Sequence, residues 1–312
     1  MHQTTKAKIL AKAETFGILT ETENLFNNAE NAVFTTKGKA TKLFGFSYLM
    51  GVNSSTKIQK NVSKGYMSGV LYLAAADNVG VNICPKATEG CAKACLFFSG
   101  RASMISKGKT ISNVNKSRFL KTALFFANRS FFNDWIFTEI ANLEKLANKK
   151  GFIPSVRLNG TADINLKTFK NSDGVNVLDK FSNIQFYDYT KVESQFKNTQ
   201  PNYDITFSFG GFANLMEVFD AVLDGKRISV PFAKETFSGQ FPATFLGMEI
   251  YDGDQTDLTF LTPSEYQVYG LKVKLPIGTK IDLSNDFFVT KERQIVIEKM
   301  FAEYKKSKLQ TA

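Results

Sequence analysis

Three cysteines lie within twelve positions of the 312-residue chain, and the rest of the chain has none. They are Cys84, Cys91 and Cys95, in the stretch VNICPKATEGCAKACLFFSGR. Charges interrupt the apolar residues of the N-terminus, so we expect no signal peptide and a reducing, cytoplasmic environment. Clustered thiols are then typical of metal or redox chemistry. Three small buried hydrophobes are the alternative, but burial does not explain why all three share one loop.

Iron–sulfur and zinc sites make different demands on these thiols. A closed zinc site needs four ligands, and the only histidine is His2, at the far terminus. Zinc would therefore need water or a carboxylate as well, for which Glu89 is the nearest candidate. A 4Fe–4S cluster is held by thiolates, and three of them leave one iron with an open position. We favour the cluster because the site is one ligand short, and zinc stays the alternative.

The chain around the cysteine loop alternates between strand and helix patterns. A short apolar strand over 69–75 runs directly into the loop, and helical periodicity covers 108–150. Further strands are predicted at 152–164, 184–191, 203–211 and 228–233, with a helix at 212–227. This alternation predicts an α/β fold, a partial (β/α) barrel of mostly parallel strands, with its chemistry at the C-terminal ends of the strands.

The two ends of the chain depart from this alternation. Residues 1–65 are predicted to be an N-terminal extension packed on the core, with a helix near 5–15 and strand or irregular structure over 31–51. Residues 66–312 are predicted to form a single barrel-like domain. It ends in a C-terminal β segment from two strand-like runs beyond 235 and a helix at 288–307. No apolar run is long enough to span a membrane.

Several segments together resemble an uncharacterised family of phage proteins known as gene product 88. In chain order, over residues 37–274, they are KGKATKLFGFSY, ICPKATEGCAKACLFFSGR, RLNGTADI, FYDYTK, LGMEIYDGDQTDLTFL and YGLKVK. The resemblance implies a phage or prophage origin, and so the cytoplasm of the host. The family supplies no activity.

The order of strand, three-cysteine loop, TADI, YTK and FSF is similar to radical S-adenosylmethionine enzymes, most of all to the spore photoproduct lyase branch. That resemblance implies a 4Fe–4S cluster on the three cysteines and S-adenosylmethionine as cofactor. The cofactor-binding positions it implies are Thr161, Asp163, Lys191 and Ser208. The loop departs from the family, with gaps of six and three residues in place of three and two, and Ala94 where an aromatic residue is usual.

The chemistry of these residues supports such roles without the resemblance. The ammonium of Lys191 can pair with a ligand carboxylate, and Asp163 or Asp188 can hold an amino group, a ribose or a metal. The structural alternatives are a solvated lysine and a helix-capping aspartate. Asp252, Asp254 and Asp257, in YDGDQTD, are spaced as in a calcium loop, but the closing glutamate is missing, so we interpret them as an acidic turn.

A net charge of +10 favours an anionic partner. The run after the cysteine loop is the best candidate for phosphate contact, at a helix N-terminus, with Phe97 and Phe98 available to stack on bases. Its basic residues are Arg101, Lys107, Lys109, Lys116, Arg118 and Lys121. The alternative is a solvated helix face.

The sequence thus predicts an iron–sulfur enzyme of radical S-adenosylmethionine type. It would act on a nucleic acid, a nucleotide or a protein during infection. The alternative function is a non-enzymatic, metal-stabilised protein that binds DNA or RNA through its basic face.

Overall fold

A nine-stranded, mostly parallel sheet organises the fold, in the strand order β1-β2-β3-β4-β5-β6-β9-β8-β7. The computed structural model describes residues 2–30, 32, 37–95, 97, 99–197, 200–274 and 278–311. The strands are β1 (Met50–Val52), β2 (Tyr66–Leu71), β3 (Ile153–Arg157), β4 (Gln185–Thr190), β5 (Tyr203–Ser208), β6 (Ile228–Phe232), β7 (Thr244–Phe245), β8 (Met248–Asp252) and β9 (Val268–Lys272).

The strands from β2 to β6 pair in sequence order, and each pair is parallel. Strand β9 continues the parallel set between β6 and β8, while β1 and β7 are antiparallel additions at the two edges. The predicted α/β class and the mostly parallel strands are confirmed. The sheet is not closed, since no pairing joins its two edge strands among the described residues.

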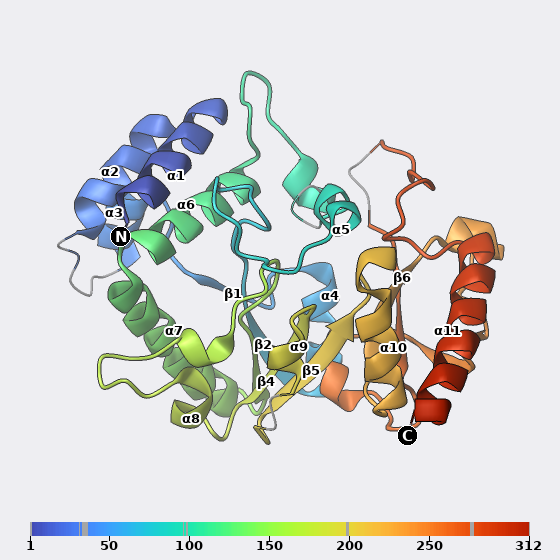
Figure 1. Cartoon of the computed structure of the whole chain (residues 1–312). Coiled ribbons are helices and arrows are strands. Elements are labelled where there is room, and N and C mark those ends of the chain that lie inside the picture. Colours follow the sequence, from blue (N-terminus) through green and yellow to red (C-terminus); the bar gives the residue numbers. More distant parts are fainter. Residues whose placement is uncertain are drawn as a thin grey trace.

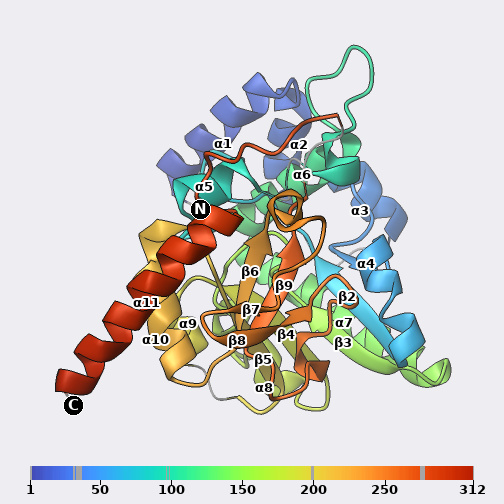
Figure 2. The same cartoon turned by 90° about the vertical axis from the view of Figure 1, so that its right-hand side faces the viewer.

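Helices connect the strands and cover one face of the sheet (Figure 1). The helices are α1 (Gln3–Thr15), α2 (Leu19–Ala29), α3 (Lys37–Phe44), α4 (Thr56–Gln59), α5 (Glu89–Lys93), α6 (Asn113–Ala127), α7 (Arg129–Lys149), α8 (Val177–Lys180), α9 (Glu193–Phe196), α10 (Leu215–Leu223) and α11 (Lys291–Thr311). Helix α7 packs on β2 and β3, and α10 packs on β5 and β6. Helix α11 lies along α10 (Figure 2). Among the described residues, no helix has the length and apolar content needed to cross a membrane.

The two faces of the sheet differ in polarity because successive side chains of a strand point to opposite sides. On the helix-covered face, Val156 and Val230 belong to the two apolar cores. On the other face, Arg157, Tyr189 and Ser229 line a cavity. We call this second side the inner face.

The segments after β1 and after β8 meet across the open side of the sheet. The Lys60 ammonium donates to the carbonyl of Asp254 at 2.8 Å, and the Thr256 hydroxyl donates to Asn61 Oδ1 at 3.1 Å. These contacts link the two ends of the parallel set without strand pairing.

One sequence prediction of local structure is wrong within the N-terminal region. Part of the segment predicted as strand or irregular is helix α3, because Ala40 and Phe44, four residues apart, both lie buried in the core. Residues 31 and 33–36 of that segment lie outside the described part. The helix predicted near 5–15 is present as α1.

Candidate metal and cofactor site

A cavity of about 290 Å³ opens on the inner face, where the parallel strands end. Among its lining residues are all seven that the sequence assigned to metal and cofactor binding: Cys84, Cys91, Cys95, Thr161, Asp163, Lys191 and Ser208. They come from four separate loops or strand ends, as expected for the C-terminal edge of a parallel sheet. The structure therefore brings the predicted residues together.

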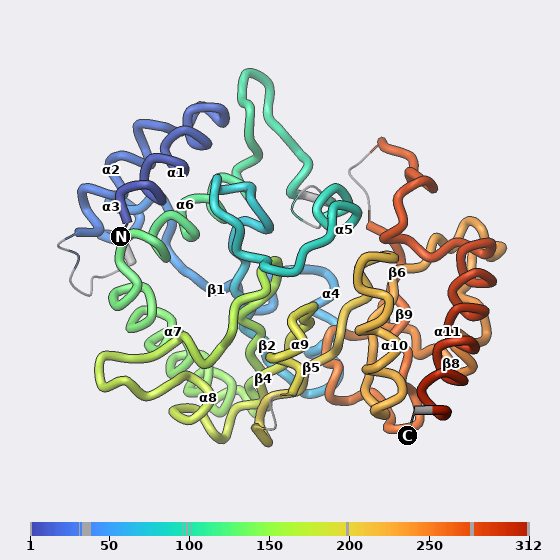
Figure 3. The backbone as a smooth tube through the Cα atoms, in the orientation of Figure 1, coloured from blue at the N-terminus to red at the C-terminus, as the bar shows by residue number. Residues whose placement is uncertain are grey.

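The cysteines lie on the long excursion that leaves β2 and passes above the sheet before α6 begins (Figure 3). Thr88 caps the short helix α5 by accepting a hydrogen bond from the amide of Cys91 at 3.1 Å. The Thr88 hydroxyl also donates to the carbonyl of Gly210, beyond the end of β5. Through these two bonds, Thr88 holds the cysteine loop against the far wall of the cavity.

Backbone groups already hydrogen-bond two of the sulfur atoms. The amide of Ala76 donates to Cys84 Sγ at 3.3 Å, and the amide of Phe97 donates to Cys95 Sγ at 3.4 Å. Burial nevertheless raises the pKa of the Cys84 thiol to about 12 and that of the Cys95 thiol to about 11. All three cysteines are free thiols.

The described side chains include no set of three or more His, Cys, Asp or Glu that is arranged to hold a metal ion as it stands. The three sulfurs share one cavity wall but do not converge as a ligand set. Glu89, the candidate fourth ligand for zinc, points away from this wall. Its carboxylate is largely exposed and pairs with Lys93 at 2.6 Å. His2 lies at the start of α1, where it caps the helix by accepting from the amide of Thr4.

Lys191 lies beside the cysteines and is partly buried. Its ammonium lies close to Cys91 and 5.7 Å from the ring centre of Phe287. Burial lowers the pKa of Lys191, but the negative charge of a Cys91 thiolate and of Asp163 outweighs it, so the pKa is raised overall. The interpretation of Lys191 as a solvated surface lysine is therefore wrong.

Asp163 is buried and ties two strand ends together. Its Oδ2 accepts from the backbone amide of Lys191 at 2.9 Å, and its Oδ1 accepts from the Thr190 hydroxyl at 2.8 Å and the Gln195 amide at 3.3 Å. Burial raises its pKa above the ordinary value. Asp163 thus places Lys191 at the cavity wall.

The remaining predicted polar residues take different positions. The Thr161 hydroxyl donates to the carbonyl of Leu73 at 2.6 Å, and the Ser208 and Ser229 hydroxyls are 3.2 Å apart on neighbouring strands. Asp188 does not line the cavity. It is fully buried behind the wall, where its Oδ1 accepts from the amide of Asn159 at 3.0 Å.

A second charged group lines the same cavity, and the sequence analysis missed it. Arg157 Nη1 donates to both oxygens of Asp257, at 3.1 and 3.3 Å, and Lys57 pairs with Asp257 at 3.2 Å. The guanidinium of Arg157 also stacks on the ring of Tyr189, 4.6 Å from its centre. Because Arg157 and Asp257 are one hundred residues apart, no local spacing indicated that they meet.

The acidic turn that contains Asp257 is only partly as predicted. Asp252 Oδ1 accepts from the amide of Asp254, and Asp254 Oδ2 accepts from the amide of Lys272 on β9, both at 2.9 Å. These two carboxylates stabilise a turn. Asp257 instead points inward and is 2% exposed, which removes it from the turn surface.

The predicted basic run does not form one exposed face. Lys107 and Lys109 are exposed, whereas Lys116 pairs with Glu21 at 2.6 Å. Arg118 stacks on Tyr72, and Lys121 donates to the carbonyl of Leu49 at 3.0 Å.

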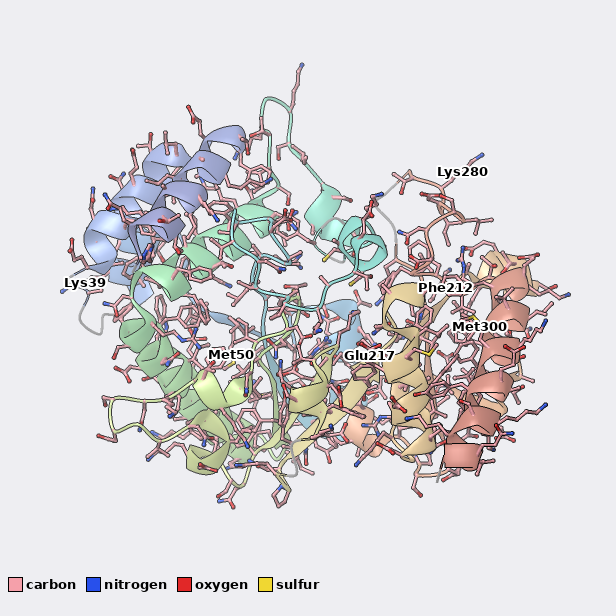
Figure 4. The ribbon with its side chains drawn as sticks, viewed as in Figure 1. Lys39, Met50, Phe212, Glu217, Lys280 and Met300 are labelled. Atoms are coloured by element: carbon pink, nitrogen blue, oxygen red, sulfur yellow. The ribbon has the colours of Figure 1, made fainter. Side chains whose placement is uncertain are left out.

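One further part of that prediction is not favoured, because Phe97, predicted to stack on bases, is buried. Phe98 and the side chain of Arg101 lie outside the described part. Other lysines are spread widely over the molecule, as Lys39 and Lys280 illustrate (Figure 4). DNA or RNA binding stays a prediction, with Lys107 and Lys109 as its accessible contacts.

The fold and the site define a mixed α/β protein with three free thiols in an inner-face cavity. The chain matches the family described as gene product 88 over residues 48–280, about three quarters of its length. It therefore belongs to that family of phage proteins, as the sequence segments predicted. Neither a curated protein nor a solved structure matches the chain.

Proposed function

We propose that the protein is an iron–sulfur enzyme of radical S-adenosylmethionine type, with its cluster on Cys84, Cys91 and Cys95. One observation carries the proposal: the three thiols and the four predicted cofactor residues line a single cavity. Two further features support a cluster at this place. Backbone amides donate to two of the sulfurs, and hydrogen bonds to sulfur are among the features that tune iron–sulfur clusters. Lys191 supplies a partly buried positive charge beside the cysteines.

Cys84, Cys91 and Cys95 would hold the cluster, which when bound would supply an open iron position and one-electron chemistry toward S-adenosylmethionine. The chain's own residues do the rest. Lys191 is placed to pair with a ligand carboxylate, and Asp163 fixes the backbone from which Lys191 projects. Thr161 and Ser208 offer hydroxyl groups along the same wall.

The segment before α11 shields this end of the cavity from water. Asn285 donates to the carbonyl of Gly90 on α5 at 3.1 Å, and Asp286 accepts from the amide of Phe212 at 2.8 Å. Phe287 and Phe288 then line the cavity beside Lys191. Exclusion of water is what a reactive radical would require.

We also propose that the sheet is a partial barrel. Parallel strands that follow one another in space in sequence order, joined by right-handed crossovers, place every connecting helix on the same face. The sheet then curls around its other face, as in a (β/α) barrel. The polar inner face and the cavity support this arrangement.

The proposed substrate is a nucleic acid, a nucleotide or a protein made during infection, in the reducing cytoplasm of the host cell. The alternative function is a metal-stabilised protein without enzymatic activity that binds nucleic acid. It takes zinc or a structural cluster at the same thiols and uses the exposed Lys107 and Lys109.

Anaerobic purification followed by iron, sulfide and zinc analysis tests the proposal. We expect a brown protein with about four iron and four sulfide per chain, as a 4Fe–4S cluster requires. Cys91→Ser should lose the iron, whereas Lys93→Ser, on the exposed side of the same helix, should retain it. One zinc in place of iron would favour the alternative, and a protein that binds neither metal would refute both.

Titration of the iron-loaded protein with S-adenosylmethionine tests the cofactor. Lys191→Met should weaken binding, whereas Lys197→Met, an exposed lysine beyond the same strand, should leave it unchanged. Equal affinities of the two variants would remove Lys191 from the cofactor site.

A further inference from the structure

The group formed by Lys57, Arg157 and Asp257 is not used by the proposed cluster or cofactor site. Lys57 comes from α4 and Asp257 from the segment after β8, so the group sits where the two ends of the parallel set approach each other. It opens into the same cavity as the cysteines. Its own contacts show what it lacks.

The two cations of this group have two carboxylate partners, and a third cation lies beside them. Arg157 and Lys57 both pair with Asp257, Arg157 also pairs with Asp188 at 3.5 Å, and Lys274 lines the same cavity. Burial is the main cause of the lowered pKa of Lys57; Asp257 partly offsets it, and Lys274 lowers it further. Burial raises the pKa of Asp188 to about 8.

The donor capacity of the two cations exceeds the acceptors that the described residues supply. A guanidinium has five N–H donors and an ammonium has three. Arg157 Nε is buried and has no hydrogen-bond partner among the described residues, although Asp188 Oδ1 is 3.5 Å away. The contacts of Lys57 within the described chain include one acceptor, Asp257. A buried donor without an acceptor is costly, and the two side chains have donor capacity left for a ligand in the cavity.

We propose that Lys57 and Arg157 bind an anionic oxyacid group, a phosphate or a carboxylate, on the substrate of this cavity. That the bound group belongs to a substrate rests on the proposed function, whereas the anion site itself does not. The planar guanidinium suits two oxygens of such a group, and the ammonium supplies a point charge beside it. Both side chains are partly open to the cavity: 12% of the Arg157 side chain and 18% of the Lys57 side chain are exposed. A ligand anchored here extends across the cavity toward the cysteines.

The test uses the full-length, metal-free protein and inorganic phosphate as the probe, with acetate as the carboxylate probe and chloride at equal ionic strength as the reference. Calorimetric titration should show saturable phosphate or acetate binding, and thermal unfolding should shift upward with the bound anion. Stronger binding of phosphate than acetate assigns a phosphate group, and the reverse assigns a carboxylate. Stabilisation no greater than that by chloride would overturn the inference.

Two variants and one control variant locate the binding. Lys57→Gln should lower the affinity for the anion about tenfold, the factor expected when one charge-assisted hydrogen bond is lost. Lys274 is exposed, so Lys274→Gln should leave the fold intact and lower the affinity for the anion about two- to threefold through the lost electrostatic attraction. Lys64→Gln removes the same charge from an exposed site outside the cavity and should have no effect. Wild-type affinity in Lys57→Gln would place the anion elsewhere.

The result separates this inference from the proposed function. An iron-loaded protein that binds neither phosphate nor acetate refutes the anion site alone. A protein that binds the anion but takes up no iron refutes the proposed enzyme alone.

Discussion

Thiol reactivity provides a direct test of the electrostatics at the candidate metal site. The perturbation is alkylation of the reduced, metal-free protein with iodoacetamide, because only the thiolate reacts. Burial raises the pKa from the ordinary 9.0 to about 12 for Cys84 and to about 11 for Cys95. At pH 8, the thiolate fraction is therefore lower than that of an ordinary thiol by about 900-fold for Cys84 and about 90-fold for Cys95.

The assay resolves each site because trypsin separates the three cysteines. Cleavage after Lys64, Lys86, Lys93 and Arg101 places Cys84, Cys91 and Cys95 on different peptides. Alkylation rates in the native protein are compared with those in guanidinium, where all three thiols behave ordinarily. Between pH 8 and pH 10, the rates of Cys84 and Cys95 should rise about tenfold per pH unit, in proportion to the thiolate.

The same values predict how metal uptake depends on pH. Two thiols with pKa values well above the solution pH must each release a proton when a metal binds. The apparent affinity should therefore rise about 100-fold per pH unit from these two sites alone. If Cys84 and Cys95 in the native protein are alkylated within about threefold of their rates in the unfolded chain, their burial is not as described and both expectations fail.

Three further predictions concern the charged residues. Asp257→Asn leaves Arg157 and Lys57 without their shared partner and should lower the free energy of unfolding, measured by urea denaturation, by about 3–5 kcal/mol. The exposed Asp224→Asn should change that free energy little. Equal stabilities of the two variants would refute the pairing. Lys121→Met should instead raise the free energy of unfolding at pH 7 by about 1–2 kcal/mol. Burial lowers the pKa of Lys121 to about 8, and this cost of burying the charge exceeds the gain from its hydrogen bond to the carbonyl of Leu49. A less stable Lys121→Met protein would contradict this. If DNA or RNA binds, replacing Lys107 and Lys109 with Gln should reduce the salt slope by about two and Lys121→Met should not alter it; an unchanged slope in the double variant removes this loop from the interface.

The residues at the strand ends could be predicted from sequence because the topology is simple. When parallel strands follow one another in order, their C-terminal ends meet at one edge, so Cys84, Asp163, Lys191 and Ser208 converge without any knowledge of distant contacts. The strands and long helices were predictable for a related reason. Their apolar residues follow the period of the element that buries them.

The side chains that the sequence analysis misplaced all depend on tertiary contacts. Lys121 lies on a helix, where a lysine is normally solvated, yet its ammonium reaches the carbonyl of Leu49 on another segment. Arg157 is the last residue of strand β3, where a surface arginine is common, and its partner Asp257 resembles a turn residue. Spacing within a segment carries no information about such pairs.

The buried charges of the inner face are best explained by function rather than stability. Replacing a buried ion pair with apolar side chains is often neutral or stabilising, because desolvation offsets the attraction between the charges. The helix-covered face of the same strands shows that this chain can fill a face with apolar side chains such as Val156 and Val230. Yet Arg157 and Lys57 lie within one cavity on the opposite face, and Lys191 lines the same cavity beside the thiols. A cavity lined by partly buried cations is poorly suited to serve as a core, and well suited to hold an anionic ligand beside a set of thiols.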